Sequence, residues 1–444
     1  MSQVFITFAT SKEHDMTTYQ ITAPDRLRAD ITLPASKSIS NRALIICALS
    51  GGCLLPDNLS DCDDTKVIIR ALRDMPPTID IGAAGTAMRF MTALLAATDC
   101  GEHVLTGTER MQHRPIGLLV DALRRLGADI SYVGEECYPP LRIRGGQLEG
   151  GPVEIAGNVS SQYISALLMI GPMLTRGLKL RLTGDIISRP YIDLTLWTMR
   201  EFGADAEWTD VDTISVSPRP YRTRPYLIEN DWSAASYWYE MVALSNDPEA
   251  EVRLHGLMDG SKQGDSSVRY IFSLLGVRTT FASKEPGRPT TVTLRKNGHC
   301  VPRLEYDFVN APDLAQTVVA ACCGLGVPFR FRGLHTLRIK ETDRIQALKT
   351  EMGKLGYDLR VDAGDQLSWD GTMIDSPARQ ADAPTAIDTY KDHRMALSFA
   401  PLALRRPIAI NDPEVVSKSY PRYWDDLRSS EFRVHSSEFR VQSS

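Results

Sequence analysis

A strand–helix pattern that recurs along the chain constrains the fold more than any other feature of the sequence. Alternating apolar and polar residues that end in glycine, a pattern typical of a strand, occur at 104–107, 180–184, 252–256 and 329–333. About 20 residues later comes a helical pattern that ends in an apolar residue followed by glycine, at Gly127, Gly203, Gly276 and Gly356. Both series recur every 70 to 80 residues. A repeat of this length predicts a fold built from copies of one α/β unit.

The number of copies indicates the architecture. Two weaker copies, at 58–72 and 411–427, bring the total to six. A chain of 444 residues is too long for one ordinary core and favours two domains. We therefore expect a mixed α/β fold of two domains, each with three units that combine helices with a sheet of mixed strand direction.

Composition narrows the possible partners. The net charge of −5 provides no broad basic surface for a nucleic acid, and no stretch of 18 apolar residues is present to span a membrane. The eight cysteines form no C-x-x-C pair, and none lies at zinc-binding spacing from a histidine, so we expect no metal. Scattered free thiols suit a reducing compartment. We expect a cytoplasmic protein with small-molecule ligands and no cofactor, and take a monomer as the default.

The two ends of the chain lack the periodicity of a core. Residues 1–15 contain no signal-peptide segment, and we expect a dispensable leader before the strand pattern that opens at Met16. At the other end, the sequence SSEFRV at 429–434 recurs at 436–441. Because this tail is polar and repetitive, we predict a disordered segment over 429–444 whose removal leaves stability and activity unchanged.

Unusual polar residues gather where each strand-end glycine leads into a helix. These positions hold Arg110, Arg114, Ser188, Arg189, Lys262, Lys340, Arg344 and Lys418. A helix start offers unpaired N–H groups and the positive end of the helix dipole, so several such starts with basic side chains can bind anions together. One such residue alone is more often a solvated surface charge. Recurrence at the same place in successive units favours an anion site.

A Ser/Lys/Ser cluster at 33–45 is the densest polar signal in the chain. Lys37, Ser38 and Arg42 surround the start of an apolar helix that we expect to begin near Ala43. The alternative is an ordinary helix start capped by a neighbouring serine or asparagine. Such a cap does not need flanking cations, and this favours a ligand-binding role.

A Gly/Ala-rich turn at 82–90 enters another helix, with Gly85 in the turn and Arg89 one turn further on. Glycine in such a turn lets the backbone approach a ligand closely. Further motifs follow in order: RMQHRPI (110–116), SSQY (160–163), SRPYIDL (188–194), QGD (263–265), PDLAQT (312–317), LRIKETDRI (337–345), YKDHRMA (390–396) and SKSYP (417–421). In this order, the whole series resembles the 5-enolpyruvylshikimate-3-phosphate (EPSP) synthase family over roughly residues 20–427.

The resemblance implies a specific architecture. Members of the family have two domains, each of three βαβαββ units related by pseudo-threefold symmetry, in an inside-out α/β barrel. Two chain crossings near residues 35 and 228 would give one domain at 36–228 and a discontinuous one at 16–35 plus 229–428. Closure of the domains over the substrates is a further family feature, and it suits a reaction that excludes water.

The resemblance also assigns ligand contacts, residue by residue. For shikimate 3-phosphate it implies Lys37, Ser38, Arg42, Ser160, Ser161, Gln162, Ser188, Tyr191, Asp313, Thr336 and Lys340. For phosphoenolpyruvate it implies Lys37, Gly85, Arg89, Arg114, Gln162, Arg344, Arg394 and Lys418. Arginine suits such ligands because its planar fork matches carboxylate and phosphate groups.

Four residues are implied for the chemistry, in which the 5-hydroxyl of shikimate 3-phosphate attacks C2 of phosphoenolpyruvate and phosphate leaves. Asp313 would accept the hydroxyl proton, and Glu341 would transfer a proton at the methylene carbon. Lys37 would act beside them, and His393 would orient its neighbours, with a role in proton transfer as the alternative. The sequence leaves open whether Glu341 starts protonated, since adjacent cations favour its ionised form.

Two departures and two alternatives remain at this stage. The family commonly has asparagine at the positions of Ala83 and Thr336, which puts one loop and one substrate contact in doubt. A transferase acting on UDP-N-acetylglucosamine would carry Lys–Asn in place of Lys37–Ser38 and a reactive cysteine after Arg110, and neither is present. A catalytically silent binding protein would be expected to lose its acidic residues or Lys37 first, and they are present.

Overall fold

Five four-stranded sheets with one common strand order form the framework of the computed structural model, which describes residues 15–51, 54–285, 287–362, 366–376 and 383–440. In four of the sheets the order is first, second, fourth and third strand along the chain, and in the fifth the N-terminal strand of the chain takes the place of the fourth strand. The first two strands are parallel, and the other pairings are antiparallel. The strand segments predicted from the repeat are the second strands of four of these sheets, β4, β8, β11 and β15.

In the first half of the chain the sheets contain β3 (Thr78–Asp80), β4 (Glu102–Thr106), β6 (Leu141–Arg144) and β5 (Asp129–Tyr132), and β7 (Gly151–Ala156), β8 (Leu178–Thr183), β10 (Thr213–Val216) and β9 (Ala206–Trp208). The other three sheets contain β2 (Arg28–Thr32), β11 (Glu251–Met258), β13 (Pro289–Cys300) and β12 (Leu275–Phe281); β14 (Leu304–Asp307), β15 (Phe329–Arg332), β17 (Gln366–Trp369) and β16 (Arg360–Asp362); and β18 (Thr385–Ile387), β19 (Ile408–Asn411), β1 (Asp15–Thr22) and β20 (Arg433–Arg440).

The α-helices are α1 (Lys37–Leu49), α2 (Asp63–Asp74), α3 (Gly85–Ala96), α4 (Glu109–Gln112), α5 (Gly117–Arg125), α6 (Ser161–Ile170), α7 (Arg189–Glu201), α8 (Trp232–Leu244), α9 (Val268–Leu274), α10 (Ala315–Leu325), α11 (Arg344–Lys354), α13 (His393–Phe399) and α14 (Tyr423–Ser429). Short 3₁₀ helices are η1 (Gly171–Met173), η2 (Gly264–Ser267), η3 (Phe308–Asn310), η4 (Pro312–Leu314), η5 (His335–Ile339), η6 (Ala400–Leu404) and η7 (Pro413–Lys418).

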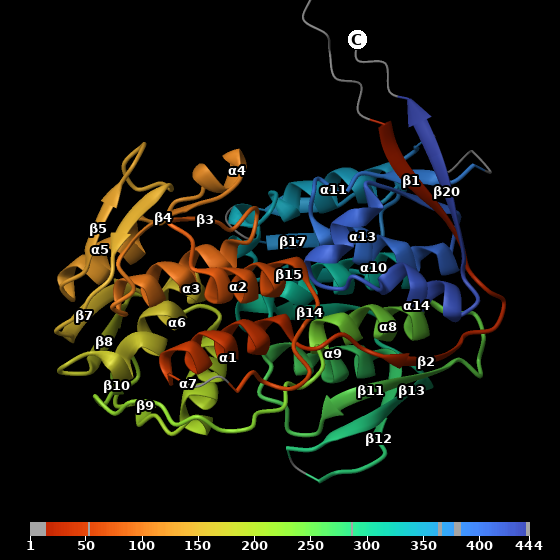
Figure 1. The fold of residues 1–444 in the computed structure, drawn as a ribbon. Helices are drawn as coiled ribbons and strands as arrows, with labels where there is room; N and C mark the ends of the chain where they lie inside the picture. The colour runs from red at the N-terminus through yellow and green to blue at the C-terminus, as the bar shows by residue number, and fades with distance from the viewer. Residues whose placement is uncertain (1–14, 52–53, 286, 363–365, 377–382, 441–444) are drawn as a thin grey trace, which may run out of the picture.

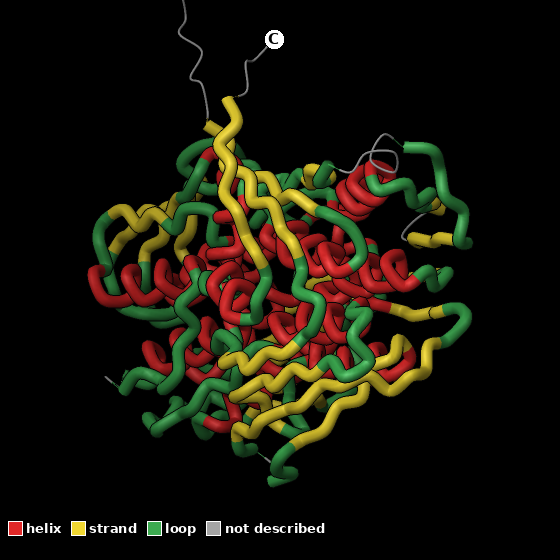
Figure 2. Tube along the Cα trace, turned by 90° about the vertical axis from the view of Figure 1, so that its right-hand side faces the viewer, coloured by secondary structure: helices red, strands yellow, loops and turns green. Residues whose placement is uncertain are grey.

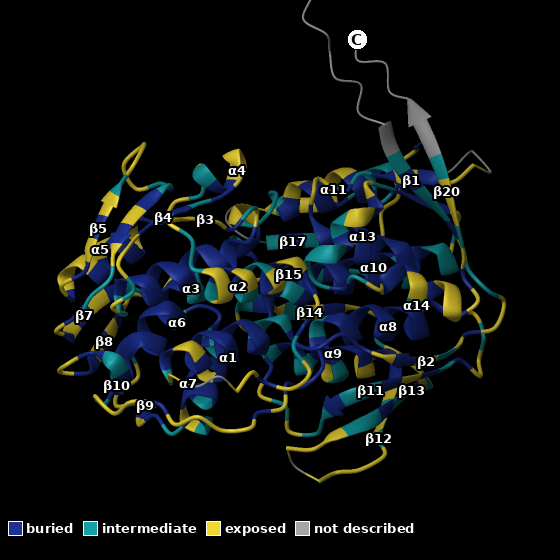
Figure 3. Ribbon diagram, in the orientation of Figure 1, coloured by how far each residue is buried: buried dark blue, intermediate teal, exposed yellow. Residues whose placement is uncertain are grey.

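Helices, rather than sheets, occupy the centre of the molecule. All twelve residues of α3 are buried, and α8 and α10 are buried almost throughout. Apolar residues occur on every side of these helices, as expected for helices surrounded by protein. In Figures 1 and 2 the helices fill the interior and most strands lie toward the outside, and Figure 3 shows the same helices as the most buried elements. The predicted mixed α/β, inside-out fold is confirmed.

Two hydrophobic cores divide the chain. One contains residues between 35 and 228, and the other combines residues 21–33 with residues 232–432. The chain passes between them where Ala35 and Asn230 form an isolated antiparallel bridge. The first core is therefore inserted between β2 and α8 of the second. The two-domain architecture is confirmed, and the boundaries near residues 35 and 228 stay a prediction.

The first unit of the first domain differs from the other five. Its helices α1 and α2 are present, but among the described residues its strands reduce to one parallel bridge between Asp57 and Leu227. The weak copy at 58–72 therefore corresponds to a helical unit without a four-stranded sheet. The sequence signal was weak here because the strand alternation is missing.

The C-terminal segment belongs to the last sheet, so the predicted disorder is wrong for residues 429–440. β20 pairs antiparallel with all eight residues of β1. Phe432, just before β20, is only 3% exposed and lies in the second core. In the other four sheets the third and fourth strands follow each other closely, whereas here β20 and β1 come from opposite ends of the chain. Residues 1–14 and 441–444 lie outside the described residues.

We predict that removal of β20 destabilises the protein. A chain that ends at Ser429 loses the outer strand of its sheet, exposes the edge of β1 and loses buried Phe432, and truncation of a buried phenylalanine alone costs about 3 kcal/mol or more. A chain that ends at Arg440 serves as the control and should unfold like the parent. The measurement is the thermal unfolding midpoint of the three proteins. Equal midpoints for the parent and the shorter chain would contradict the role assigned to β20.

A buried acid in α8 makes a second stability prediction. Glu240 is fully buried, and neither of its carboxyl oxygens has a hydrogen-bond partner among the described residues. Burial raises the pKa of Glu240 well above its ordinary value, with Cys322, Cys323 and Tyr423 the titratable groups around it on α10 and α14. The folded protein therefore holds Glu240 protonated, whereas the unfolded chain ionises it above about pH 4.5. Stability from this site is complete below that pH and falls as the pH rises.

Replacing the carboxyl by a neutral amide should remove this loss. We expect Glu240→Gln to raise the free energy of unfolding at pH 8 by about 1 kcal/mol or more, because each unit of pKa difference corresponds to about 1.4 kcal/mol. The gain should shrink toward pH 4.5. Glu136→Gln, at an exposed position, is the matched control. Denaturant unfolding at several pH values measures both, and an equal pH slope for parent and Glu240→Gln would contradict the prediction.

Candidate active site

Helix α1 begins earlier than the sequence suggested. Its first residue is Lys37 rather than a position near Ala43, and Ser36 caps it by accepting a hydrogen bond from the Ile39 N–H. The start is fixed by the chain crossing, since Ser36 N–H also donates to the Glu229 carbonyl. Lys37 and Ser38 therefore lie in the first turn of the helix.

A cavity of about 710 Å³ lies between the two domains. The predicted site residues that line it are Lys37, Ser38, Arg42, Gly85, Arg89, Arg114, Ser160, Ser161, Gln162, Ser188, Tyr191, Asp313, Thr336, Lys340, Glu341, Arg344, His393 and Arg394. Lys418 is the exception among the predicted residues: its ammonium donates to the Lys391 carbonyl, and only its own carbonyl reaches Lys37, at 3.2 Å from Nζ. The structure thus brings residues from most of the chain to one place.

Helix starts converge on this cavity. α1, α3, α6, α7, α11 and α13 each place their first residue or their N-cap in its wall. Because the helices lie inside the sheets, their N-terminal ends meet between the domains, and each contributes free N–H groups and a positive dipole end. This geometry favours anionic ligands.

The cavity carries an excess of positive charge. Among the described residues its wall contains eight lysine or arginine side chains and four carboxylates, although the chain as a whole has a net charge of −5. Arg42 is held by neutral groups, with Nε donating to Thr195 Oγ1 at 2.7 Å and Nη2 donating to Ser165 Oγ at 3.0 Å. Burial lowers the pKa of Arg42 to about 10. A buried cation without a carboxylate partner is costly unless an anion binds beside it.

Gly85 lets two further guanidinium groups approach each other. A Cβ atom at Gly85 would lie 2.5 Å from Arg114 Nη1 and 2.7 Å from Arg89 Nη1. Arg89 Nη1 donates to the Gly85 carbonyl at 2.8 Å. Burial, and secondly the charge of Arg89, lower the pKa of Arg114 to about 10. Two like charges this close form a clamp for a doubly charged anion such as phosphate.

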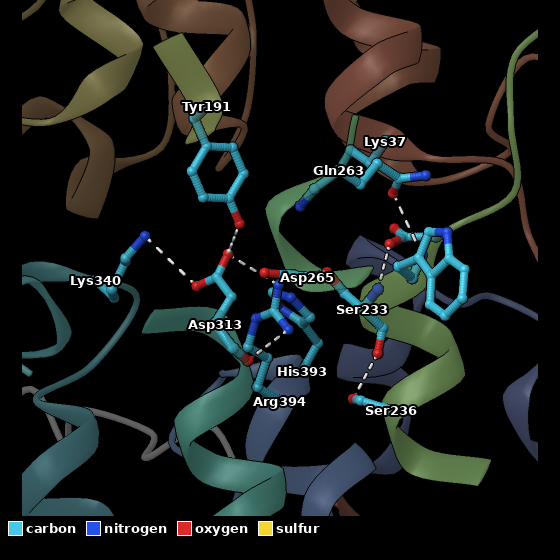
Figure 4. A network of polar contacts seen from close by, with 12 residues as sticks. Lys37, Tyr191, Ser233, Ser236, Gln263, Asp265, Asp313, Lys340, His393 and Arg394 are labelled. Carbon is cyan, nitrogen blue, oxygen red and sulfur yellow. Dashed lines mark hydrogen bonds and ion pairs between the residues drawn. The ribbon is translucent and has the colours of Figure 1, made fainter. Parts of the chain in front are cut away.

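Carboxylates occupy the opposite wall, held by Arg344. Its guanidinium donates to Asp392 at 2.7 Å, to Glu341 at 2.9 Å and to Asp313 at 3.1 Å. Asp313 also accepts from Tyr191 Oη at 3.2 Å and pairs with Arg394 at 3.0 Å. Figure 4 shows Tyr191 of the first domain and Asp313 of the second pointing toward each other across the cavity, with Lys340 beside them.

These contacts set the charge state of the acidic residues. Burial opposes the charge of Asp313, but the cations of Arg394 and Lys340 outweigh it and hold its pKa well below the usual range. Burial is likewise outweighed at Glu341, chiefly by Arg344, and its pKa also lies well below the ordinary value. Both side chains are therefore carboxylates. This answers the question that the sequence left open for Glu341.

Lys37 carries a positive charge, whereas His393 is neutral. Burial disfavours the charge on Lys37, but Asp64, whose Oδ2 lies 3.7 Å from Nζ, outweighs it and raises the pKa of Lys37. Burial lowers the pKa of His393 well below its ordinary value, so its imidazole is neutral. His393 Nδ1 lies 3.8 Å from Asp392, too far for a hydrogen bond, and has no partner among the described residues.

Sequence reasoning missed several residues of this site. Asp64 lines the cavity next to Lys37, and Asp392 anchors Arg344 from behind while it caps α13 through the Arg394 N–H. Tyr237, in the wall, accepts from Arg394 at 3.4 Å. Asp392 belongs to the YKDHRMA motif, so a signal was available. Nothing local distinguished Asp64 or Tyr237 from ordinary helix residues.

Thr336 stands where the family commonly has asparagine. It lines the cavity, and its buried Oγ1 has no hydrogen-bond partner among the described residues. A hydroxyl held free in a cavity wall is available to a ligand.

Within the described residues, no group of three His, Cys, Asp or Glu side chains is placed to hold a metal ion, and no helix has the length and apolar character needed to cross a membrane.

Comparisons with known proteins show the family to which this chain belongs. The family model for EPSP synthase (3-phosphoshikimate 1-carboxyvinyltransferase) matches residues 21–79 and 75–427. A 3-phosphoshikimate 1-carboxyvinyltransferase of Bacteroides fragilis is 58% identical over 417 residues, covering 94% of this chain and 98% of the relative. One from Photobacterium profundum is 36% identical over 431 residues, covering 90% and 96% of the two chains.

Solved structures share the fold. An EPSP synthase from Acinetobacter baumannii superposes with a TM-score of 0.74 at 21% identity, covering 95% of this chain and 100% of the other. The enolpyruvyl transferase NikO from Streptomyces tendae gives a TM-score of 0.69 at 16% identity, covering 96% and 100%. From the family match and the identity to the curated relatives, this chain belongs to the EPSP synthase family.

Proposed function

We propose that this chain transfers the enolpyruvyl group of phosphoenolpyruvate to the 5-hydroxyl of shikimate 3-phosphate and releases phosphate, a step of the shikimate pathway to chorismate and the aromatic amino acids. The observation that carries the proposal is the contrast between the two walls of the cavity. One wall has buried arginines without carboxylate partners among the described residues, and the other has ionised Asp313 and Glu341. Two phosphorylated acids need the first wall, and proton transfer needs the second.

The two substrates divide the cavity between them. We assign shikimate 3-phosphate to Ser38, Arg42, Ser160, Ser161, Gln162, Ser188, Tyr191, Thr336 and Lys340. We assign phosphoenolpyruvate to the clamp of Gly85, Arg89 and Arg114, to Arg344 and Arg394, and to Lys37 between the two substrates. Lys418 joins them only if its ammonium leaves the Lys391 carbonyl. Anion binding relieves the unfavourable burial of these cations, and part of the binding free energy comes from that relief.

The carboxylates then carry the protons. Asp313, already ionised, accepts the proton of the 5-hydroxyl as the hydroxyl oxygen attacks C2 of phosphoenolpyruvate. Glu341 gains a proton when the anionic substrates enter, delivers it to C3 and takes one back from C3 as the C2–O bond to phosphate breaks. Protonated Lys37 gives a proton to the departing phosphate and regains one from Asp313 through solvent, so that the proton lost by the 5-hydroxyl ends on the phosphate, while neutral His393 orients Glu341.

The free thiols of the seven described cysteines suit a reducing compartment, and we propose that the enzyme works in the cytoplasm. We take it to act as a monomer, since all of the proposed contacts come from one chain.

We predict phosphate release only when both substrates are present. Purified protein given phosphoenolpyruvate and shikimate 3-phosphate should release phosphate and form an enol ether, because the cavity binds the two anions side by side. The measurement is a phosphate assay with each substrate alone and with both, together with mass spectrometry of the product. Turnover with UDP-N-acetylglucosamine in place of shikimate 3-phosphate would reject the proposal.

Substitutions in the two walls of the cavity should affect different kinetic parameters. Asp313→Asn and Glu341→Gln should lower kcat by roughly 10² or more, the usual scale for a positioned acid or base. Arg114→Gln should act mainly on the KM for phosphoenolpyruvate. It is a cleaner probe than a change at Arg394, whose guanidinium also holds Asp313. Asp99→Asn, on the surface, is the control. The assignment fails if Glu341→Gln changes only KM.

A further inference from the structure

A side-chain hydrogen bond joins the two domains at the outer edge of the cavity. Ser417 Oγ, in η7 of the second domain, donates to Oδ2 of Asp63 at 2.6 Å. Asp63 is the first residue of α2 in the first domain, 354 positions away along the chain. α2 and η7 are packed against each other at this point. The bond is exposed, and neither of its two residues lines the cavity.

The chain neighbours of both partners contact Lys37. Asp64, next to Asp63, lies 3.7 Å from Lys37 Nζ, and the carbonyl of Lys418, next to Ser417, accepts from the same Nζ at 3.2 Å. The ammonium of Lys37 is therefore held by one group from each domain. A shift of η7 relative to α2 would separate these two groups.

The other side of the cavity has its own contacts between the domains. Tyr191 donates to Asp313 there, and the Ser188 N–H donates to the Val309 carbonyl. These contacts involve neither η7 nor α2. On the α2 side, Asp63 and Ser417 each lie one residue from a group that holds the Lys37 ammonium.

We propose that Asp63 and Ser417 form a clasp between the domains, which holds η7 against α2 and so positions Lys37 and Lys418 for phosphoenolpyruvate. The inference rests on the proposed function, and it makes both partners positioning residues that never touch the substrate. An exposed hydrogen bond is weak enough to open when substrates enter and to re-form when they are bound.

The test is Ser417→Ala, which removes the donor without adding bulk. We expect the KM for phosphoenolpyruvate to rise about three- to tenfold, the effect of losing one hydrogen bond, while kcat changes less than twofold and the unfolding midpoint stays the same. The KM for shikimate 3-phosphate should change less. Asp63→Ala should have the same effect, and the double variant should match either single one, because both remove the same bond.

A matched control is available within one domain. Ser217 Oγ donates to Asp205 Oδ2 at 2.9 Å in an exposed pair of the first domain. Ser217→Ala removes the same kind of bond away from the cavity and should leave both KM values unchanged. Small-angle X-ray scattering tests the clasp independently of enzymatic activity. The Ser417→Ala variant should have a larger radius of gyration than the parent and than Ser217→Ala.

Specific outcomes would overturn the clasp. An unchanged KM for phosphoenolpyruvate, additive effects in the double variant, or an unchanged radius of gyration would each do so. Equal increases in both KM values with a lower unfolding midpoint would mean that the bond is only structural. A parent protein that releases no phosphate would instead reject the proposed function, and the scattering comparison would then still decide on the clasp.

Discussion

The ion cluster around Arg344 is the interaction on which the rest of the site depends. This side chain is 2% exposed, and a buried guanidinium is tolerated only when its charge is matched. Asp392, which is fully buried, supplies the match and also caps α13, while Arg344 itself opens α11. The Arg344–Asp392 ion pair thus fixes the starts of α11 and α13. The remaining N–H groups of Arg344 donate to Asp313 and Glu341. The proposed base and the proposed acid are held by the same cation.

The inside-out arrangement explains why such a cluster can exist. Apolar helices such as α3 and α8 form the interior, so their ends rather than their sides face the gap between the domains. Helix N-termini then provide the positive potential, and basic side chains in the first turns add to it. The same arrangement places glycine at the start of α3, where a methyl group would collide with two arginines. The fold and the distribution of charge in the cavity therefore both follow from the packing of the helices inside the sheets.

Much of this site was visible in the sequence because the motifs are local. The KETDR segment around Glu341 and Arg344, and the Gly85 turn, each combine a helix start with its ligand-facing side chains within a few residues. Residues such as Asp64 and Tyr237 were missed because their roles depend on a partner from a distant segment. The start of α1 was placed too late because Ser36 is fixed by the crossing to Glu229, which no local pattern records.

The sequence by itself determined the repeating unit and the positions of the strand-end and helix-end glycines, and its motifs, through the family that they resemble, pointed to many of the cavity residues. These are properties of periodicity and of short motifs, which act over a few residues. Only the tertiary structure decided that β20 pairs with β1 at the far end of the chain, that Glu341 is ionised, and that Asp63 meets Ser417 across the domains. Strand pairing and charge state depend on what lies nearby in space, and residues adjacent in space here are hundreds of positions apart along the chain.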